Sequence, residues 1–425
     1  MQGSTWVIVL IVFCRQHSTN AVRKLEERFS WRTIHYDFDS PEEVDAKKDG
    51  GYYIYGNSII TSLARYGDKL FLATPRLKPG VPSTLNYIHV DDSDARTPIL
   101  KPYPSLEANE YYNITAKVKT MVSIINVKVD NCNRLWALDT GVVDELTSRK
   151  VEKPPAIFVY RMSDDTLQRK YSFKDEEYSQ TSKIRTIVVD DTVGNCEKAY
   201  AYIADSTGGL IVYSWESNQS FRVEHNYFHF DPLWGNLKTG RGTLRQVSDG
   251  LQGMALSLPR RNGYRELLFH PLISINEFSV PTQVLQNKSL AQQNITAFFH
   301  LGERGPGMQS SASYMDEESG VLLYTAIVKN SLACWSSFWG DEYQPKTQGI
   351  VDTFEGVNPT NQGTLDTFEE AAYPADVTVD INGTVWVLTN KLLDFMFEKN
   401  GNNIGCHIYS GTVRHIIRGT PCSED

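Results

Sequence analysis

The chain lacks an excess of basic residues. Its 42 lysines and arginines are outnumbered by 51 aspartates and glutamates, which gives a net charge of −9 and a pI near 5.6. Proteins that bind nucleic acid gain affinity from basic patches that neutralise phosphates. We therefore expect no nucleic-acid partner.

The sequence also lacks an apolar run of membrane-spanning length. Residues 6–14 (WVIVLIVFC) are apolar throughout but fall far short of the roughly 20 residues that cross a bilayer. This run fits the centre of a signal peptide, with small residues at 18–21 as a cleavage zone, although residues 1–5 carry no Lys or Arg. A buried N-terminal strand is the alternative. We expect a signal peptide over residues 1–21 and a secreted mature chain, residues 22–425, with no membrane partner.

Familiar catalytic and metal-binding motifs are missing. The sequence contains no G-x-S-x-G elbow, no P-loop, no H-E-x-x-H and no dinucleotide-binding fingerprint. His225 and His229 are four residues apart, but their aromatic surroundings and the following Asp231-Pro232 favour strand or loop over a helix that would align them. We expect no metal and no cofactor.

Cysteine is scarce, and no two cysteines form a C-x-x-C pair, which argues against a zinc site. The six cysteines are Cys14, Cys132, Cys196, Cys334, Cys406 and Cys422. Cys14 would leave with the signal peptide, so an odd number remains and at least one is unpaired within the chain. Disulfides are expected in an oxidising compartment, but the spacing alone leaves many pairings open.

Sites for N-linked glycans are present in some number. Asn-x-Ser/Thr sequons occur at Asn113, Asn218, Asn287, Asn294 and Asn382. In a secreted chain, each of them predicts an exposed loop or strand end.

A repeated hairpin runs along the whole chain. Six short strands, each following a turn, recur 55 to 67 residues apart, at 67–72, 133–138, 199–204, 264–269, 319–324 and 382–387. Another run rich in β-branched and aromatic residues precedes each of them, and a third strand often follows, as at 156–160 and 210–215. A fixed long period is typical of repeat architectures. We predict an all-β fold, a single six-bladed β-propeller over residues 22–425, closed by joining the first and last strands and with outer strands of the last blade at 405–410 and 413–417. A pair of irregular β-sandwiches is the alternative.

Four segments together resemble the yellow / major royal jelly protein family of insects: residues 131–141 (NCNRLWALDTG), 201–206 (AYIADS), 249–257 (DGLQGMALS) and 388–391 (LTNK). The resemblance extends from about Phe29 to Cys422. It implies a six-bladed propeller, secretion, glycosylation and two disulfides, Cys132–Cys196 and Cys334–Cys406, with Cys422 left over.

Polar residues that follow the repeated strands are candidates for a ligand pocket, because loops at one end of a propeller converge on the axis. Asp139, Asp205 and His270 are candidate catalytic residues. Candidate ligand-binding residues are Thr140, Ser206, Asn330, Thr389 and Asn390. The alternative for each Asp, Thr, Ser or Asn is an ordinary turn former. Asn390 is favoured, since its Thr-Asn-Lys context matches a family segment that contributes to amine binding.

The resemblance implies a role in melanin and cuticle pigmentation, with dopachrome conversion as the activity. This tautomerisation needs a base and a hydrogen-bond donor, and no cofactor. Asp139, Asp205 or His270 would be the base, and Asn390 or Thr140 the donor. The expected partner is a small aromatic molecule: dopachrome, a catecholamine or an indoleamine. The alternatives are a non-catalytic binder of biogenic amines such as dopamine and serotonin, or a structural protein of cuticle or eggshell.

Overall fold

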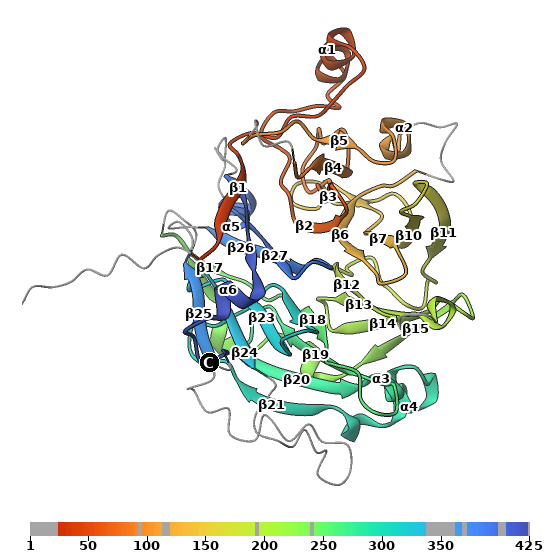
Figure 1. Cartoon of the computed structure of the whole chain (residues 1–425). Helices are drawn as coiled ribbons and strands as arrows, with labels where there is room; N and C mark the ends of the chain where they lie inside the picture. Colours follow the sequence, from red (N-terminus) through yellow and green to blue (C-terminus); the bar gives the residue numbers. More distant parts are fainter. Residues whose placement is uncertain are drawn as a thin grey trace, which may run out of the picture.

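The computed structural model describes residues 24–91, 96–112, 120–191, 195–238, 242–336, 362–367, 372–397 and 405–423. Six four-stranded antiparallel sheets lie around a central axis, as a six-bladed β-propeller (Figure 1). The predicted signal peptide, residues 1–21, lies outside the described residues, as does Asn113.

Five of the sheets are built from consecutive parts of the chain, ordered from the axis outwards. The first holds β2 (Ser62–Tyr66), β3 (Lys69–Ala73), β4 (Leu85–His89) and β5 (Lys101–Pro102). The second holds β6 (Ile124–Val129), β7 (Arg134–Asp139), β10 (Ala156–Arg161) and β11 (Thr166–Ser172). The third holds β12 (Ile184–Asp190), β13 (Tyr200–Asp205), β14 (Gly209–Ser214) and β15 (Gln219–Glu224). The fourth holds β18 (Leu251–Leu256), β19 (Glu266–Pro271), β20 (Asn276–Pro281) and β21 (Phe299–Glu303). The fifth holds β22 (Ser313–Asp316), β23 (Val321–Ala326), β24 (Ser331–Ser336) and β25 (Gln362–Thr367).

The sixth sheet joins the two ends of the chain. Its order is β26 (Tyr373–Val379), β27 (Thr384–Asn390), β28 (Cys406–Thr412) and then β1 (Glu26–Trp31). β1 pairs antiparallel with β28, so the N-terminal strand completes the last blade. This confirms the predicted closure of the ring.

The innermost strand of each blade packs against the innermost strands of its two neighbours. Around the ring, β2 contacts β6, β6 contacts β12, β12 contacts β18, β18 contacts β22, β22 contacts β26, and β26 contacts β2. These six strands surround the axis, and their two ends open on opposite faces of the ring.

The hydrophobic core is divided among the interfaces between blades. On β7, Trp136 and Leu138 pack toward the third sheet, whereas Leu135 and Ala137 pack toward the first. Successive side chains of a strand point to opposite faces, so one strand serves two interfaces. All six residues of β7 are buried for this reason.

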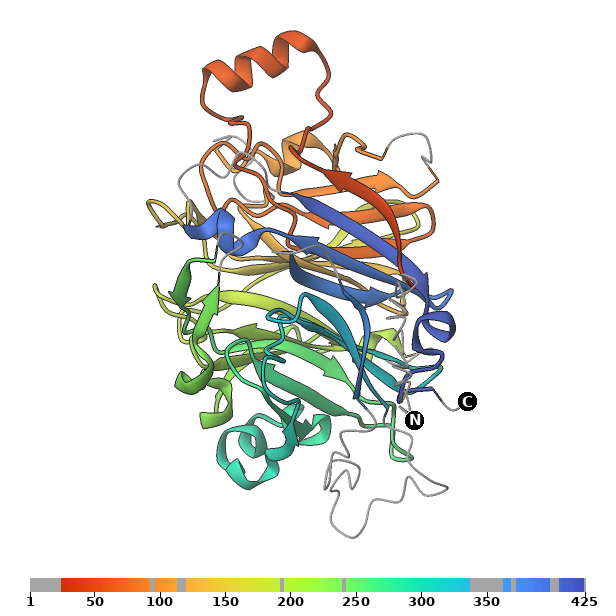
Figure 2. The same cartoon turned by 90° about the vertical axis from the view of Figure 1, so that its left-hand side faces the viewer.

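Smaller elements decorate the loops. Two-stranded hairpins are β8 (Val142–Val143) with β9 (Lys150–Val151), and β16 (Asn236–Lys238) with β17 (Leu244–Gln246). The helices are α1 (Pro41–Asp49), α2 (Leu106–Asn109), α3 (Thr282–Leu285), α4 (Lys288–Gln293), α5 (Leu392–Phe397) and α6 (Val413–Ile417). Short 3-10 turns are η2 (Cys196–Lys198), η3 (Asn226–Phe228), η4 (Pro232–Trp234) and η5 (Ile295–Ala297). Figure 2 shows α1 projecting from the ring, with α5 and the β16–β17 hairpin at one end of the blades and α6 at the other. Among the described helices, none has the length and apolarity to cross a membrane.

The six predicted hairpins are all present, with shifts of a few residues at their ends. One predicted outer strand is wrong: residues 413–417 form α6, and β1 takes the outer place in the last blade. Val413, Ile416 and Ile417 are buried in the core between the fifth and sixth sheets. Their spacing of three and four places them on one face of a helix, whereas a strand would separate them.

One predicted disulfide is confirmed and the other is wrong. Cys132 bonds to Cys196, but Cys334 bonds to Cys422, and Cys406 is free and buried. The pairing follows from the face of the sixth sheet on which each cysteine lies. Cys406 points into the core between the sixth and first sheets, whereas Cys334 and Cys422 share the core between the fifth and sixth.

We predict that Cys422→Ser exposes two thiols, Cys334 and Cys406, to alkylation of the denatured mature chain. It should lower the free energy of unfolding by about 2–5 kcal/mol, because the lost bond closes a long loop. Cys406→Ala should retain both disulfides and leave no thiol. Counting alkylated cysteines by mass spectrometry checks this, and a Cys422→Ser protein without any free thiol would show that Cys334 pairs with Cys406.

Candidate functional site

A pocket, here called the axial pocket, opens at one end of the innermost strands. It is lined by the first residues of these strands, among them Asn126 on β6, Thr186 on β12 and Gln252 on β18. Its cavity measures about 100 Å³. Residues that follow the second strand of a blade also reach it, including Leu272 and Asn390, so it lies at the end where the sequence places its candidates.

Two ion pairs lie at the axial pocket. Arg185 donates to both carboxylate oxygens of Glu145, at 3.1 and 2.6 Å. Burial alone would raise the pKa of Glu145, but the charge of Arg185 and its hydrogen bonds hold that pKa below its ordinary value. Burial would lower the pKa of Arg185, yet Glu145 and the nearby Asp249 raise it. Asp249 itself accepts a hydrogen bond from Lys183 Nζ at 2.6 Å.

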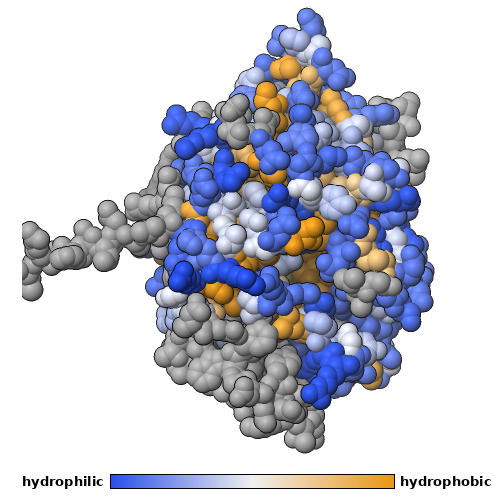
Figure 3. All heavy atoms as spheres, in the orientation of Figure 1, coloured by the Kyte–Doolittle hydropathy of each residue, from blue (hydrophilic) through white to orange (hydrophobic). Residues whose placement is uncertain are grey.

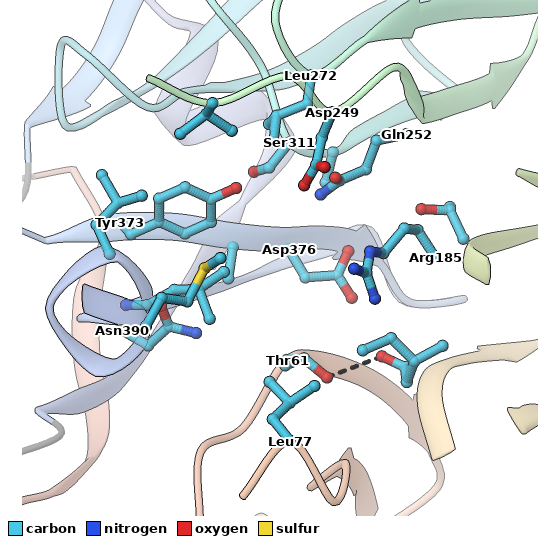
Figure 4. Close-up of a pocket in the computed structure, with 18 of the residues that line it drawn as sticks. Thr61, Leu77, Arg185, Asp249, Gln252, Leu272, Ser311, Tyr373, Asp376 and Asn390 are labelled. Carbon is cyan, nitrogen blue, oxygen red and sulfur yellow. Dashed lines mark hydrogen bonds between the residues drawn. The ribbon is translucent and has the colours of Figure 1, made fainter. Parts of the chain in front are cut away.

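A third carboxylate, Asp376 on β26, stands nearer the axis. One of its oxygens accepts from the Ser62 hydroxyl at 2.6 Å and from the Leu63 backbone N–H at 3.1 Å. Lys128 Nζ lies 3.7 Å from its other oxygen. In Figure 4 this carboxylate faces the guanidinium of Arg185 across the pocket.

Tyr373, the first residue of β26, presents a buried hydroxyl to the pocket. This hydroxyl makes no hydrogen bond of good geometry with any described residue, although Ser311 and Gln252 lie beside it. Burial raises the pKa of Tyr373 above its ordinary value, and the charge of Asp249 adds to the effect. The hydroxyl is therefore protonated at neutral pH and free to donate a hydrogen bond to a ligand.

Apolar side chains form the rest of the wall. They come from α5, from the β16–β17 hairpin and from loops after the second strands: Leu77, Leu146, Leu237, Val247, Leu272, Leu392, Leu393 and Met396. Apolar walls with a few placed polar groups are typical of small-molecule sites.

Of the predicted site residues, Asn390 alone lines the axial pocket. Its amide is already engaged, because Nδ2 donates to the Ile60 carbonyl at 2.8 Å and Oδ1 accepts from the Leu392 N–H at 2.9 Å. Asn390 therefore fixes the start of α5 against the first blade and presents the remaining edge of its amide to the pocket.

Asp139 and Asp205 do not line this pocket. Asp139 accepts backbone N–H groups from Val122, Ser123 and Gly141, at 2.7 to 2.9 Å. Asp205 accepts from several groups in the same way: Ser182 Oγ, the backbone N–H of Lys183 and Thr207, Thr207 Oγ1 and Arg222. Both carboxylates tie the loop before their own blade to its second strand.

His270 is sealed inside the fourth sheet. Its Nδ1 lies 2.9 Å from Glu277, and its side chain has no exposed area. A methyl group on Gly253 would sit 1.9 Å from Nε2, so that nitrogen faces bare backbone. Burial lowers the pKa of His270, and Arg304 adds to this. The imidazole has no route to a substrate in the axial pocket.

The remaining candidates also lie outside the pocket lining. Thr140 Oγ1 accepts from the Val142 N–H, and Asn330 adopts a left-handed turn with its amide against the carbonyls of Ile327 and Ala372. Ser206 and Thr389 are buried, with hydroxyls that have no partner among the described residues.

The polar residues that do line the pocket were missed by the sequence analysis: Glu145, Arg185, Asp249, Gln252, Tyr373 and Asp376. The residues predicted from the sequence lie at or after the end of the second strand of each hairpin, whereas most of these residues lie at or near the start of the first strand. A polar residue at the start of an otherwise apolar inner strand, such as Asn126, Arg185 or Asp376, is the signal that could have found them.

Comparisons with known proteins identify the family of the chain. The profile of the family described as "Major royal jelly protein" matches residues 122–422. "Protein yellow" of Drosophila melanogaster and of Drosophila simulans are each 33% identical over 425 residues, covering 99% of this chain and 74% of the relative.

Among solved structures, a virginiamycin B lyase from Staphylococcus aureus covers 84% of this chain and 95% of its own, with a TM-score of 0.41 and 8% identity. A Bacteroides thetaiotaomicron protein of unknown function covers 83% of this chain and 69% of its own, with a TM-score of 0.45 and 12% identity. The family match and the yellow relatives, which span nearly the whole chain, show that this protein belongs to the major royal jelly protein family as a yellow-type member.

Proposed function

We propose that the chain acts in the melanin pigmentation pathway and converts dopachrome by tautomerisation in the axial pocket. The observation that carries this proposal is the Tyr373 hydroxyl, which is buried, protonated and without a hydrogen bond of good geometry to any described residue, on the side of the pocket where Asp249 lies. The reaction removes a proton from a ring carbon and delivers one to a quinone oxygen, so it needs a base and a donor within reach of one ring.

In this proposal Asp249 is the base and Tyr373 the donor. Lys183 orients Asp249 through the 2.6 Å hydrogen bond, and Arg185 with Glu145 forms a fixed polar wall. The leucines that line the pocket cover the ring of the substrate and exclude water. Asn390 contacts the ligand at the opposite side of the pocket, beside α5. No cofactor takes part in this scheme.

The alternative is a binder of dopamine, serotonin or a related amine. Three carboxylates line the pocket, on Glu145, Asp249 and Asp376, and a protonated amine would pair with Asp249 or Asp376. The two functions differ in turnover and can be separated by experiment.

We predict that Tyr373→Phe lowers kcat for dopachrome by about 100-fold, in the range of one lost proton-transfer group, with a smaller change in KM. Loss of dopachrome absorbance measures the rate. Tyr324→Phe is the matched control, because the Tyr324 hydroxyl is also buried and has no hydrogen-bond partner in the described part of the chain, but it lies between the fourth and fifth sheets, away from the pocket. Equal rates for Tyr373→Phe and the control would remove Tyr373 from the reaction.

We predict that Asp249→Asn lowers dopachrome turnover by about 100-fold or more, since it removes the base while keeping the shape of the side chain. Calorimetry with dopamine and serotonin is run alongside. If wild type shows no turnover but binds these amines stoichiometrically, and Asp249→Asn loses that binding, the protein is the binder.

We further propose that the chain is secreted and glycosylated, which the family membership supports. Of the sequons, four lie on described residues, and all four asparagines are exposed: Asn218, Asn287, Asn294 and Asn382. Expression in insect cells should yield a medium-borne protein that begins near residue 22 and loses mass on treatment with an N-glycosidase. N-terminal sequencing and mass spectrometry check both points, and a product retained in cells with residues 1–21 intact would contradict them.

A further inference from the structure

A second cavity lies at the other end of the same innermost strands. The axial pocket is lined by Asn126, Thr186 and Gln252. Two residues further along the same strands, this cavity is lined by Lys128, Val188 and Met254. We call it the opposite cavity, and it measures about 100 Å³. It opens on the face that carries α6, and Figure 3 shows an apolar hollow near the centre of that face.

Several acidic residues near this end of the blades stabilise the hairpin turns by accepting hydrogen bonds. Asp130 accepts from the backbone N–H of Cys132 and Arg134, from Arg134 Nε and from Trp136 Nε1. Asp380 does the same in the sixth blade, where it accepts from Trp386 Nε1. These aspartates hold the turn of a hairpin, and their oxygens are occupied.

Asp191 is different, because it follows the turn aspartate of the third blade and plays no part in its own hairpin. Among the described residues its hydrogen-bond donor is Asn131 of the neighbouring blade, through the backbone N–H at 2.5 Å and Nδ2 at 3.1 Å. It is 6% exposed and forms no ion pair with a described residue. Burial and the charge of Asp130 together raise the pKa of Asp191 to about 6, although the hydrogen bonds from Asn131 and the charge of Arg265 act to lower it. At neutral pH a buried negative charge without an ion pair to a described residue therefore faces the cavity.

The two cationic side chains that line the cavity lie beside carboxylates other than Asp191. Lys128 lies 3.7 Å from Asp376, and Arg265 pairs with Glu317 at 2.8 Å and lies 3.6 Å from Asp190. The charged and titratable residues in the lining of the cavity are Lys128, Asp130, Asp191, Arg265, Tyr314 and Glu317, and Asp190 directly precedes Asp191.

A second, independent feature of the cavity points to a ligand. Ser313 lines the cavity, is 5% exposed, and its hydroxyl has no partner among the described residues. Besides its polar and charged residues, the cavity is lined by apolar side chains such as Val188, Met254 and Leu256. Asp191 and Ser313 thus line the same cavity, together with apolar side chains.

We propose that the opposite cavity is a binding site for a small primary ammonium ion, with Asp191 and Ser313 accepting its N–H groups and the apolar wall covering its carbon chain. A primary ammonium offers three donors on a compact charge, which suits one carboxylate oxygen and one hydroxyl. A divalent metal fits poorly. Calcium takes six to eight oxygen ligands, the oxygens of Asp130 are already bonded, and Cys132 beside them is in a disulfide.

The test is calorimetry of the full mature chain with n-butylamine at pH 7.5. Wild type should bind one equivalent at this site, and Asp191→Asn should weaken binding by about 10-fold or more, as expected for a lost hydrogen bond to a charged group. Ser313→Ala should weaken it less. Tetramethylammonium, which has no N–H, should not bind. At pH 6, binding to wild type should release protons from Asp191, and Asp191→Asn should show no release.

Two controls separate this site from the axial pocket. Asp249→Asn should leave butylamine binding at the opposite cavity unchanged, and Asp191→Asn should leave dopachrome turnover unchanged. The melting temperature of each variant shows whether it is folded. If Asp191→Asn does not fold, the comparison of wild type with Ser313→Ala tests the proposal. Failure of wild type to bind butylamine, binding that neither substitution weakens, or calcium binding that depends on Asp191 would each overturn the proposal.

Discussion

The pairing of β1 with β28 is the constraint on which the rest of the structure depends. Every blade buries both of its faces, so a blade without two neighbours would leave one apolar face in water. Phe29 and Trp31 on β1 enter the core between the sixth and first sheets, where they pack with Leu70, Leu72 and Trp386. The N-terminal strand thus completes the last blade and supplies part of the core that joins it to the first. Closing the ring therefore also buries the apolar faces of the first and sixth sheets against each other.

A closed ring fixes where chemistry can occur. The innermost strands use most of their length to pack against one another, so only their ends face open space. At one end, the loops after the second strands, α5 and the β16–β17 hairpin surround the axial pocket. At the other end, the turns between the first and second strands of several blades surround the opposite cavity. Lys128 lines the opposite cavity, and its ammonium lies beside Asp376 of the axial pocket, so this ion pair stands between the two.

The acidic residues of the chain divide into two groups with different duties. Asp139 and Asp205 accept backbone N–H groups at the ends of second strands, and Asp130 and Asp380 do so in the hairpin turns. Such carboxylates stabilise the repeat and are unavailable to a ligand. The carboxylates of the axial pocket, and Asp191 of the opposite cavity, belong to positions outside this repeated pattern, which explains why the aspartates picked from the repeat, Asp139 and Asp205, are structural.

The sequence by itself determined the architecture, because strand periodicity, turn residues and a regular repeat are local properties that survive without knowledge of contacts. It located the six hairpins, the closure and the end of the propeller that holds the axial pocket. The choice between Cys406 and Cys422 as the partner of Cys334, and the grouping of Arg185, Asp249, Tyr373 and Asp376, were decided only by the tertiary structure. These depend on which face of a sheet a side chain takes and on which distant blades meet at the axis, and neither is encoded in the spacing of residues along the chain.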